Sequence, residues 1–283
     1  MYFEEICALI DRAIQEDIRS GDITSQVCVD PKEEIEGVFI LKQEGVLAGL
    51  SFLEEIFTRI SSSIRVDLLA EEGVSQHAGT LIATISGNAQ GILSAERVAL
   101  NFLQHASGIA TKTAEFVEEL EGFDCDVLNT RNTVPGMRCL ERHAVEIGGG
   151  KSHRTGLDEW FIIKPIHLFL LQKQYDDPIM EAVERARNYN SEIVIEIQVE
   201  DLRNLEKVIG PKPDIILLNH MNPQEIARAV KKIRKHGNTY IEVTGDIDLN
   251  TIVSYAESGV DGISIPELTR SVSGLDISFR FKV

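Results

Sequence analysis

The chain is short of cysteine. It has four in 283 residues, and no two of them form a CxxC pair. This scarcity argues against a disulfide-rich secreted fold, and a cysteine-built metal site is not expected. We expect reduced, buried thiols at Cys7, Cys28, Cys125 and Cys139.

Positive charge is also scarce, with 28 Lys and Arg against 45 Asp and Glu, a net charge of −17. A nucleic-acid backbone and an anionic membrane both require an extended basic surface, so neither is an expected partner. No apolar run reaches the roughly 18–20 residues that span a bilayer. The first residues have the pattern of an acidic amphipathic helix and not of a signal peptide. We therefore expect a cytoplasmic protein.

What remains is an ordinary globular composition, with 43% hydrophobic and 26% charged residues, in a chain long enough for a barrel and a smaller domain. A helical pattern over residues 6–17 precedes short alternating runs between about 36 and 90, including GVLAGL at 45–50, with one helix at about 51–60. Residues 94–120 then favour one or two helices. We predict a first α+β domain over 1–106.

The second half repeats a strand followed by a helix. Apolar runs lie at 194–198, 214–218, 239–243 and 261–265, each of the first three followed by a helical stretch, and 126–130 and 161–164 are earlier candidates. This order predicts parallel βα units in an α/β barrel or open sheet. In barrels of this kind, ligand groups lie at the carboxyl ends of the strands. Five polar residues fall at these predicted ends: Arg131, Lys164, Gln198, Asn219 and Thr244.

One segment differs in charge from the rest of the chain. From Arg131 to Lys164 there are six Lys and Arg against four Asp and Glu, net +2, and the segment also contains His153 and Arg154. Cations gathered inside an acidic protein usually bind an anion. A small, multiply negative ligand is the first hypothesis for this region.

Six motifs along the chain resemble quinolinate phosphoribosyltransferase, the carboxylating nicotinate-nucleotide pyrophosphorylase family of NAD biosynthesis. The resemblance is colinear and covers residues 7–279. The motifs are EDIRSGDIT (16–24), EGVLAGL (44–50), SAERVALNFLQHASGIATKT (94–113), TRNTVPG (130–136), GGGKSHRTGL (148–157) and GVDGISIPELTRSVSGLDIS (259–278).

The resemblance implies the α/β class, with an amino-terminal α+β open-faced sandwich and a seven-stranded parallel α/β barrel. The sandwich would hold residues 1–106 together with a returning segment, 267–283, and the barrel would hold residues 107–266. The family forms a dimer in which the sandwich of one subunit caps the barrel of the other. A homodimer or a higher even oligomer is therefore expected.

In this family, quinolinate reacts with phosphoribosyl pyrophosphate (PRPP), and one carboxylate is lost as carbon dioxide. Carried over by position, Arg97 would reach the neighbouring subunit's site, and four residues would line the acceptor pocket: Arg131, His153, Arg154 and Lys164. Such cations suit a dicarboxylate, because a guanidinium can grip a carboxylate with two hydrogen bonds. Lys164 and His153 are the predicted catalytic residues.

The other half of the site departs from the family pattern. Asn132 replaces a lysine, and Gln198 and Asn219 replace two acids that help to position the Mg²⁺–PRPP complex. The phosphate-binding S-G-G turn is Thr244–Gly245–Asp246, and Pro266 replaces a later glycine. Amides are weaker Mg²⁺ ligands than carboxylates, an aspartate repels phosphate, and proline removes an N–H donor. Mg²⁺ is therefore expected only if PRPP is used.

Three functions stay open on this pattern: the family transfer reaction, a PRPP-independent decarboxylase or other enzyme acting on a di-acid, and a non-catalytic carboxylate binder. His220, beside Asn219, is a possible new acid or base. The glycines at 148–150 predict a tight turn that lets His153 and Arg154 approach the ligand, and Trp160 is expected only to pack.

Overall fold

The structure is a computed structural model that describes residues 2–281. The chain divides into two compact units. Unit 1 comprises Met1–Ala114, Asn132–Gly149 and Glu267–Val283, and unit 2 comprises Glu115–Arg131 and Gly150–Pro266. Each unit is described by itself below.

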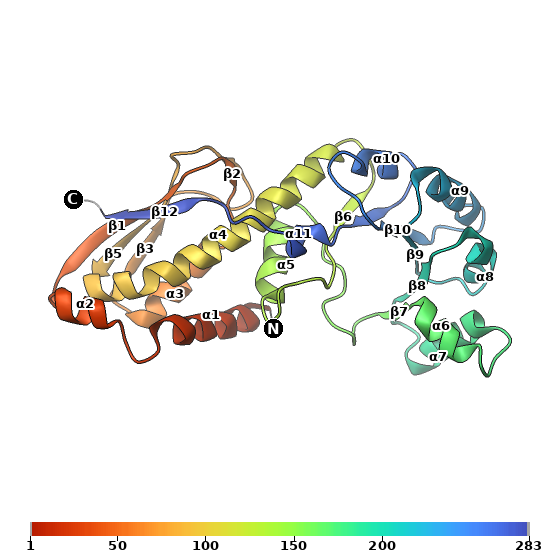
Figure 1. Ribbon diagram of the computed structural model, residues 1–283, viewed down its shortest axis with the longest axis horizontal. Coiled ribbons are helices and arrows are strands. Elements are labelled where there is room, and N and C mark those ends of the chain that lie inside the picture. Colours follow the sequence, from red (N-terminus) through yellow and green to blue (C-terminus); the bar gives the residue numbers. More distant parts are fainter. Residues whose placement is uncertain (1, 282–283) are drawn as a thin grey trace. The chain divides into compact units, whose positions relative to one another are not determined.

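Unit 1 is built on a four-stranded antiparallel sheet in the order β12-β1-β5-β3 (Figure 1). Its strands are β3 (Arg65–Leu68), β5 (Leu81–Asn88), β1 (Glu34–Leu41) and β12 (Ile277–Phe281). The last strand pairs with β1, so the carboxyl end of the chain returns to the first sheet. A small second sheet pairs β2 (Gly45–Val46) with β4 (Ser75–Gln76).

Helices accompany this sheet because their apolar residues need a covering partner. The buried side chains include Ile6 and Ile10 of the first helix and Ile56 and Phe57 of the third. The helices of unit 1 are α1 (Tyr2–Ile18), α2 (Ile23–Cys28), α3 (Leu53–Ile60), α5 (Arg138–Ile147) and α11 (Glu267–Arg270). Helix α4 (Ala89–Glu119) begins in unit 1 and ends in unit 2.

Two expectations for unit 1 were wrong in detail. The run at 45–50 is a strand only over Gly45–Val46, because Gly49 takes a left-handed conformation (φ 90°) and begins a 3₁₀ turn at Leu50–Phe52. The thiols are not all buried, since Cys28 is exposed at the end of α2. The four cysteines are free, in agreement with the expected reduced state.

Unit 2 contains a six-stranded parallel sheet in the order β6-β11-β10-β9-β8-β7. The strands are β6 (Asp126–Leu128), β7 (Phe161–Ile163), β8 (Ile195–Val199), β9 (Ile215–Asn219), β10 (Tyr240–Thr244) and β11 (Gly262–Ser264). Beyond β6, Lys151 adds a single parallel bridge to Leu128. The strands are continuous buried runs, as expected when both faces of a parallel sheet are covered. The predicted α/β class is confirmed.

The helices of unit 2 begin where the sequence provides caps. Asn222 and Glu225 form a reciprocal capping box at α9 (Pro223–Ile233), with Pro223 in the first turn, and Asp177 caps α7 (Pro178–Tyr189). The remaining helical elements are α6 (Pro165–Leu171), 3₁₀ turn η2 (Leu202–Asn204), α8 (Leu205–Ile209) and α10 (Ile252–Ala256). Among residues 2–281, no helix has the length and apolar character needed to cross a bilayer.

Candidate active site

The candidate site lies at the carboxyl ends of the unit 2 strands. Asn219 ends β9 and Thr244 ends β10, and the two residues are register partners in the sheet. Gln198 lies one residue before the end of β8, and Lys164 follows β7 directly. Polar side chains from separate parts of the sequence therefore gather at one edge of the sheet, where parallel folds bind their ligands.

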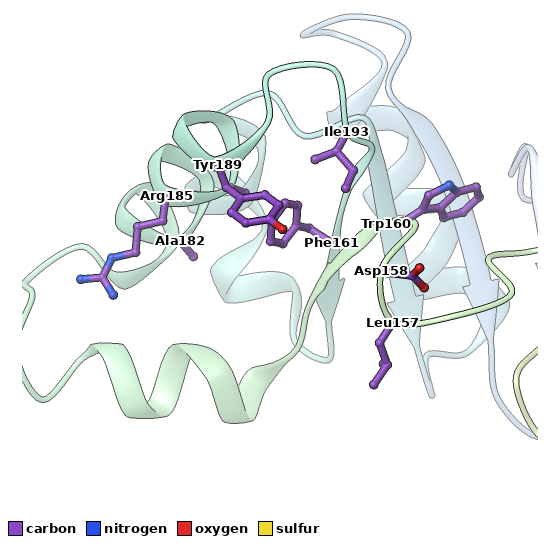
Figure 2. A pocket seen from close by; sticks show the side chains of 9 residues that line it. Leu157, Asp158, Trp160, Phe161, Ala182, Arg185, Tyr189 and Ile193 are labelled. Carbon is purple, nitrogen blue, oxygen red and sulfur yellow. The ribbon is translucent and has the colours of Figure 1, made fainter.

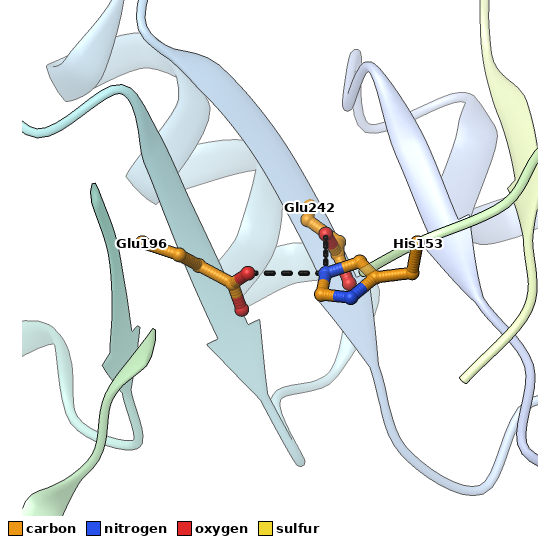
Figure 3. Close-up of side chains that lie close together, drawn as sticks. All are labelled: His153, Glu196 and Glu242. Atoms are coloured by element: carbon orange, nitrogen blue, oxygen red, sulfur yellow. Dashed lines mark hydrogen bonds and ion pairs between the residues drawn. The ribbon is translucent and has the colours of Figure 1, made fainter. Parts of the chain in front are cut away.

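His153 is held between two strands by buried carboxylates. Its Nε2 donates a hydrogen bond to Glu196 Oε2 of β8 at 3.0 Å and lies 3.3 Å from Glu242 Oε2 of β10 (Figure 3). Its backbone N–H donates to the side chain of buried Asn129 at 2.8 Å. Because both the backbone and the ring are anchored, the imidazole has a fixed place in the barrel unit.

The two glutamates are the most deeply buried charges of the site. Glu196 is 0% exposed and Glu242 is 2% exposed, and the hydroxyl of Ser264 donates to the second oxygen of Glu242. Burial disfavours the charged imidazole, but the contacts with Glu196 and Glu242 outweigh it and raise the pKa of His153 to about 9. Burial raises the pKa of the Glu196 carboxyl, the hydrogen bond from His153 opposes this increase, and repulsion from Glu242 adds to it.

Arg154 adds a buried guanidinium beside this cluster. Its side-chain Nη1 donates to the carbonyl of Trp160 at 3.0 Å, while its Nε has no hydrogen-bond partner among the described residues. Burial lowers the pKa of Arg154, and repulsion from Arg131 adds to this effect, so the two guanidiniums lie within electrostatic range of each other. Two arginines tolerate such proximity best when an anion lies between them.

Trp160 contributes more than the expected packing. Its ring meets the His153 ring edge-on, with centroids 4.6 Å apart, and its backbone carbonyl holds Arg154. The glycines before this segment form the predicted turn, in which Gly149 has a φ of 86°, and Gly148 has a packing role in addition. A Cβ on Gly148 would lie 2.5 Å from the carbonyl oxygen of Ala110, so Gly148 allows α5 to end against α4.

The two amides at the strand ends, Gln198 and Asn219, donate hydrogen bonds to Glu200, a carboxylate that was not predicted from the sequence. The side-chain nitrogens of Gln198 and Asn219 both donate to Glu200 Oε1, at 2.8 and 3.3 Å. Because a carboxylate only accepts, both NH₂ groups must face Glu200, and both amide oxygens face away from it. Glu200 and the oxygens of these two amides could therefore contact Mg²⁺ at this edge.

The predicted phosphate-binding turns are formed by Thr244, Gly245 and Asp246 after β10 and by Pro266 after β11. The hydroxyl of Thr244 donates to the Ser264 carbonyl at 2.9 Å, and Asp246 is exposed. His220 is exposed with φ 52°, and its backbone N–H donates to the Thr244 carbonyl at 3.0 Å. Its ring makes no hydrogen bond to the described residues.

Lys164, Arg97 and Asn132 are further predicted site residues. Lys164 is exposed, and its backbone N–H donates to the His167 ring at the start of α6. Arg97 is exposed on α4, and the carbonyl of Asn132 accepts from Thr269 at 2.6 Å. Arg97 and Asn132 belong to unit 1, so their place beside the unit 2 cations stays a prediction.

A separate cavity of about 390 Å³ lies between the 157–161 segment and α7 (Figure 2). Its wall is mostly apolar and includes Trp160, Phe161, Tyr189 and Ile193, with Arg185 as its one cation among the lining residues. It contains neither His153 nor Arg154. The cavity therefore differs in chemistry from the predicted anion site.

Glu196 and Glu242 were also missed from the sequence, although a signal was present. Each is the single charged residue inside an otherwise apolar strand, in VIEIQ and TYIEV. Acidic residues are almost never fully buried unless they are paired. A lone acid within a buried strand therefore indicates a partner cation, here His153.

Comparisons with known proteins identify the family of this chain. The family "Quinolinate phosphoribosyl transferase, C-terminal domain" matches residues 109–280, and its N-terminal domain matches residues 22–107. A probable nicotinate-nucleotide pyrophosphorylase [carboxylating] of Bacillus subtilis is 35% identical over 95% of this chain and 91% of its own length. The corresponding Mycobacterium leprae protein is 34% identical over 95% of this chain and 94% of its own.

Solved structures give the same result. The nicotinate-nucleotide pyrophosphorylase of Francisella tularensis superimposes with a TM-score of 0.91 at 33% identity, covering 99% of this chain and 96% of its own. NadC of Streptococcus pyogenes has a TM-score of 0.91 at 31% identity, covering 100% and 99%. The chain therefore belongs to the quinolinate phosphoribosyl transferase family of enzymes.

Proposed function

We propose that this protein binds quinolinate, or a closely similar heteroaromatic dicarboxylate, and transfers to it the phosphoribosyl group of PRPP. The products are nicotinate mononucleotide, pyrophosphate and carbon dioxide, and a proton takes the place of the lost carboxylate on the ring. The names of the relatives support this reaction. The observation that carries the proposal is the pair of cations His153 and Arg154, whose side chains are largely buried beside the strands of unit 2.

The charges of the site suit a dianion. Four cations are assigned to it, namely Arg131, His153, Arg154 and Lys164, against the two buried carboxylates Glu196 and Glu242. With His153 protonated, these six groups sum to a formal charge of +2, which is opposite and equal to the charge of a dicarboxylate. Each such contact is worth more inside a protein than in water, because the local dielectric is lower.

The proposed chemistry depends on position and charge. The cations fix the two carboxylates so that the ring nitrogen can attack the anomeric carbon as pyrophosphate leaves. Once ribosylated, the ring nitrogen carries positive charge and accepts the electron pair released by the departing carboxylate. Lys164 and His153 would stabilise the charges that change in these steps.

Mg²⁺ would enter this site with the pyrophosphate group. Glu200 supplies one carboxylate at the strand ends, and the amide oxygens of Gln198 and Asn219 face away from it. One carboxylate together with substrate phosphates is within the range of ligand sets that Mg²⁺ uses in proteins. The ion would neutralise charge on the leaving pyrophosphate.

A second candidate function is favoured by the turns at this edge. Asp246 and Pro266 occupy the places where a phosphate needs N–H donors, and the acids expected at 198 and 219 are amides. At ~4 Å and an effective dielectric near 20, one repulsion costs about 4 kcal/mol, roughly a thousandfold in affinity. The protein would then act on a di-acid without PRPP, as a decarboxylase, or bind the acid without turnover.

Calorimetry followed by product analysis separates these functions. PRPP with Mg²⁺ is titrated into the protein, then quinolinate, and the mixture is examined by mass spectrometry for nicotinate mononucleotide. Binding of both ligands with product supports the transfer reaction. Binding of quinolinate alone rules it out, and loss of carbon dioxide from the bound acid then distinguishes a decarboxylase from a binder.

A gain-of-function variant tests whether the residues that depart from the family pattern weaken the binding of PRPP. Gln198→Glu, Asn219→Asp and Asp246→Gly together restore two acids and remove one repulsive charge at the phosphate turn. We expect the affinity for Mg²⁺–PRPP to rise by about a hundredfold or more, measured by calorimetry, since the Asp246 repulsion alone is worth up to a thousandfold. Unchanged PRPP affinity in a folded triple variant would show that these positions do not control donor binding.

A further inference from the structure

The ring of His153 lies against two carboxylates that are cut off from water. Glu196 and Glu242 come from β8 and β10, strands separated in the sheet by β9, and their oxygens approach the same nitrogen at 3.0 and 3.3 Å. Glu196 Oε1 has no hydrogen-bond partner among the described residues. Burial of two anions without compensation is unfavourable, and the ring between them is placed to supply the positive charge that compensates them.

The surrounding charges balance when the imidazole is protonated. Arg154 lies close enough to act on Glu196 electrostatically, and Ser264 donates to Glu242. His153⁺ and Arg154⁺ then neutralise the two glutamates within the barrel unit. One ring nitrogen of His153 and one carboxylate oxygen each of Glu196 and Glu242 lie within 4.8 Å of one another. Such a group could hold a metal ion, but with the ring protonated no metal ion is needed to neutralise the two carboxylates.

We propose that Glu196 and Glu242 are positioning residues that hold His153 as a fixed imidazolium, with its Nε2–H committed to the barrel interior and its Nδ1–H left to bind a carboxylate of the acceptor. The assignment of the acceptor carboxylate rests on the proposed function. His153 thereby acts as a permanent cation and not as a proton carrier.

The geometry supports each part of this assignment. A protonated imidazole has two N–H donors, and Nε2 is taken by the glutamates, while no hydrogen bond to Nδ1 is found among the described residues. The ring cannot swing away, because Asn129 holds its backbone and Trp160 packs edge-on against it. The pKa of His153, raised to about 9, agrees with a ring that stays charged through neutral pH.

The proposal predicts how binding of the acceptor depends on pH. Quinolinate has both carboxylates ionised from pH 6 to 8.5, so a change in its affinity over this range reports on the protein. With His153 charged throughout, the affinity stays nearly constant. In Glu196→Gln or Glu242→Gln the ring loses one anionic neighbour, becomes neutral within this range, and the affinity falls as the pH rises.

The first measurement needs no substrate. The ring resonances of His153 are followed by NMR in labelled protein from pH 6 to 9.5, and His153→Asn identifies the signal among the seven histidines. We expect the wild-type ring to titrate near pH 9 and the two glutamine variants at least about one pH unit lower, since each lost neighbour is a charge contact. Glu206→Gln, an exposed carboxylate on α8 that pairs with Lys232, is the matched control and leaves the titration unchanged.

The second measurement titrates quinolinate by calorimetry at pH 6 and 8.5. The ratio of the two dissociation constants is expected near one in wild type and about tenfold in Glu196→Gln, and it returns to near one in Glu196→Gln/His153→Asn. Wild-type titration of His153 near pH 6.5, or equal ratios in all variants, overturns the proposal. So does elemental analysis that finds a stoichiometric metal ion lost on substitution of Glu196.

The two proposals can fail separately. If wild-type protein does not bind quinolinate at any pH, the proposed function is wrong, while the NMR titration still decides whether His153 is a fixed cation. If Glu196→Gln does not fold, Glu242→Gln on the other strand tests the same statement. A folded Glu242→Gln with an unchanged His153 titration counts against it.

Discussion

At the scale of single residues, Arg154 combines burial with a guanidinium nitrogen that has no partner. It is 9% exposed, and its Nε makes no hydrogen bond to the described residues. We predict that Arg154→Gln weakens quinolinate binding by about 1.5–3 kcal/mol, roughly tenfold to a hundredfold, because charge-assisted hydrogen bonds are of this size. Calorimetry measures the loss, and Arg228→Gln, an exposed arginine on α9, is the control. Equal affinities in the two variants would exclude Arg154 from the site.

His153 also links stability to pH. Its pKa is raised in the folded state to about 9 from an ordinary value of 6.5, so its contribution to stability is complete below pH 6.5 and is lost as the pH rises toward 9. We predict that the free energy of unfolding in urea falls by on the order of 3 kcal/mol between pH 6.5 and 9 through this group. The decrease should be clearly smaller in His153→Asn. Parallel pH profiles for the two proteins would contradict the assigned pKa.

At the scale of elements, Gly148 controls how α5 ends against α4. A Cβ at this position would lie 2.5 Å from the Ala110 carbonyl oxygen and 2.7 Å from the Thr113 Cβ, too close for any side chain. Gly148→Ala is therefore expected to lower the free energy of unfolding by about 1–3 kcal/mol through overpacking. Gly210→Ala, where the nearest atom is 3.7 Å away, should change it little. Chemical denaturation compares the two, and equal stabilities would mean that α5 shifts without cost.

The strands of unit 2 could be predicted where the sequence contains a short apolar run. The runs at 194–198, 214–218 and 239–243 lie within one residue of β8, β9 and β10, because a parallel strand that is covered on both faces is mostly apolar. The end of strand β2 was harder to predict, since the left-handed conformation of Gly49 interrupts a run that has the composition of a strand. The roles of Glu196, Glu200 and Glu242 could not be derived from spacing alone. Their contacts with His153 and Asn219 join segments that are far apart in the sequence, and only the folded chain brings them together.

At the scale of the whole molecule, the charges are divided between the surface and the site. The chain carries −17 overall, whereas the segment from Arg131 to Lys164 carries +2. The acids in the rest of the chain do not have to bind the ligand, because a field of one sign can be local to a site. The acidic composition and the anion site are therefore compatible, because only the site has to attract a dicarboxylate.

The assembly of subunits gives the last prediction. The family resemblance implies a dimer in which Arg97 acts in the partner's site, whereas Arg154 acts in the site of its own chain. If so, Arg97→Ala and Arg154→Gln each inactivate the homodimer, but a mixed dimer contains one site with neither substitution. With random association, co-expressed variants should regain about a quarter of wild-type activity, since half of the dimers are mixed and half of their sites are intact. The assay is formation of nicotinate mononucleotide from quinolinate and PRPP, with light scattering to confirm the dimer. Activity that stays at the level of the single variants, in a preparation shown to contain mixed dimers, would place Arg97 and Arg154 in the site of the same chain.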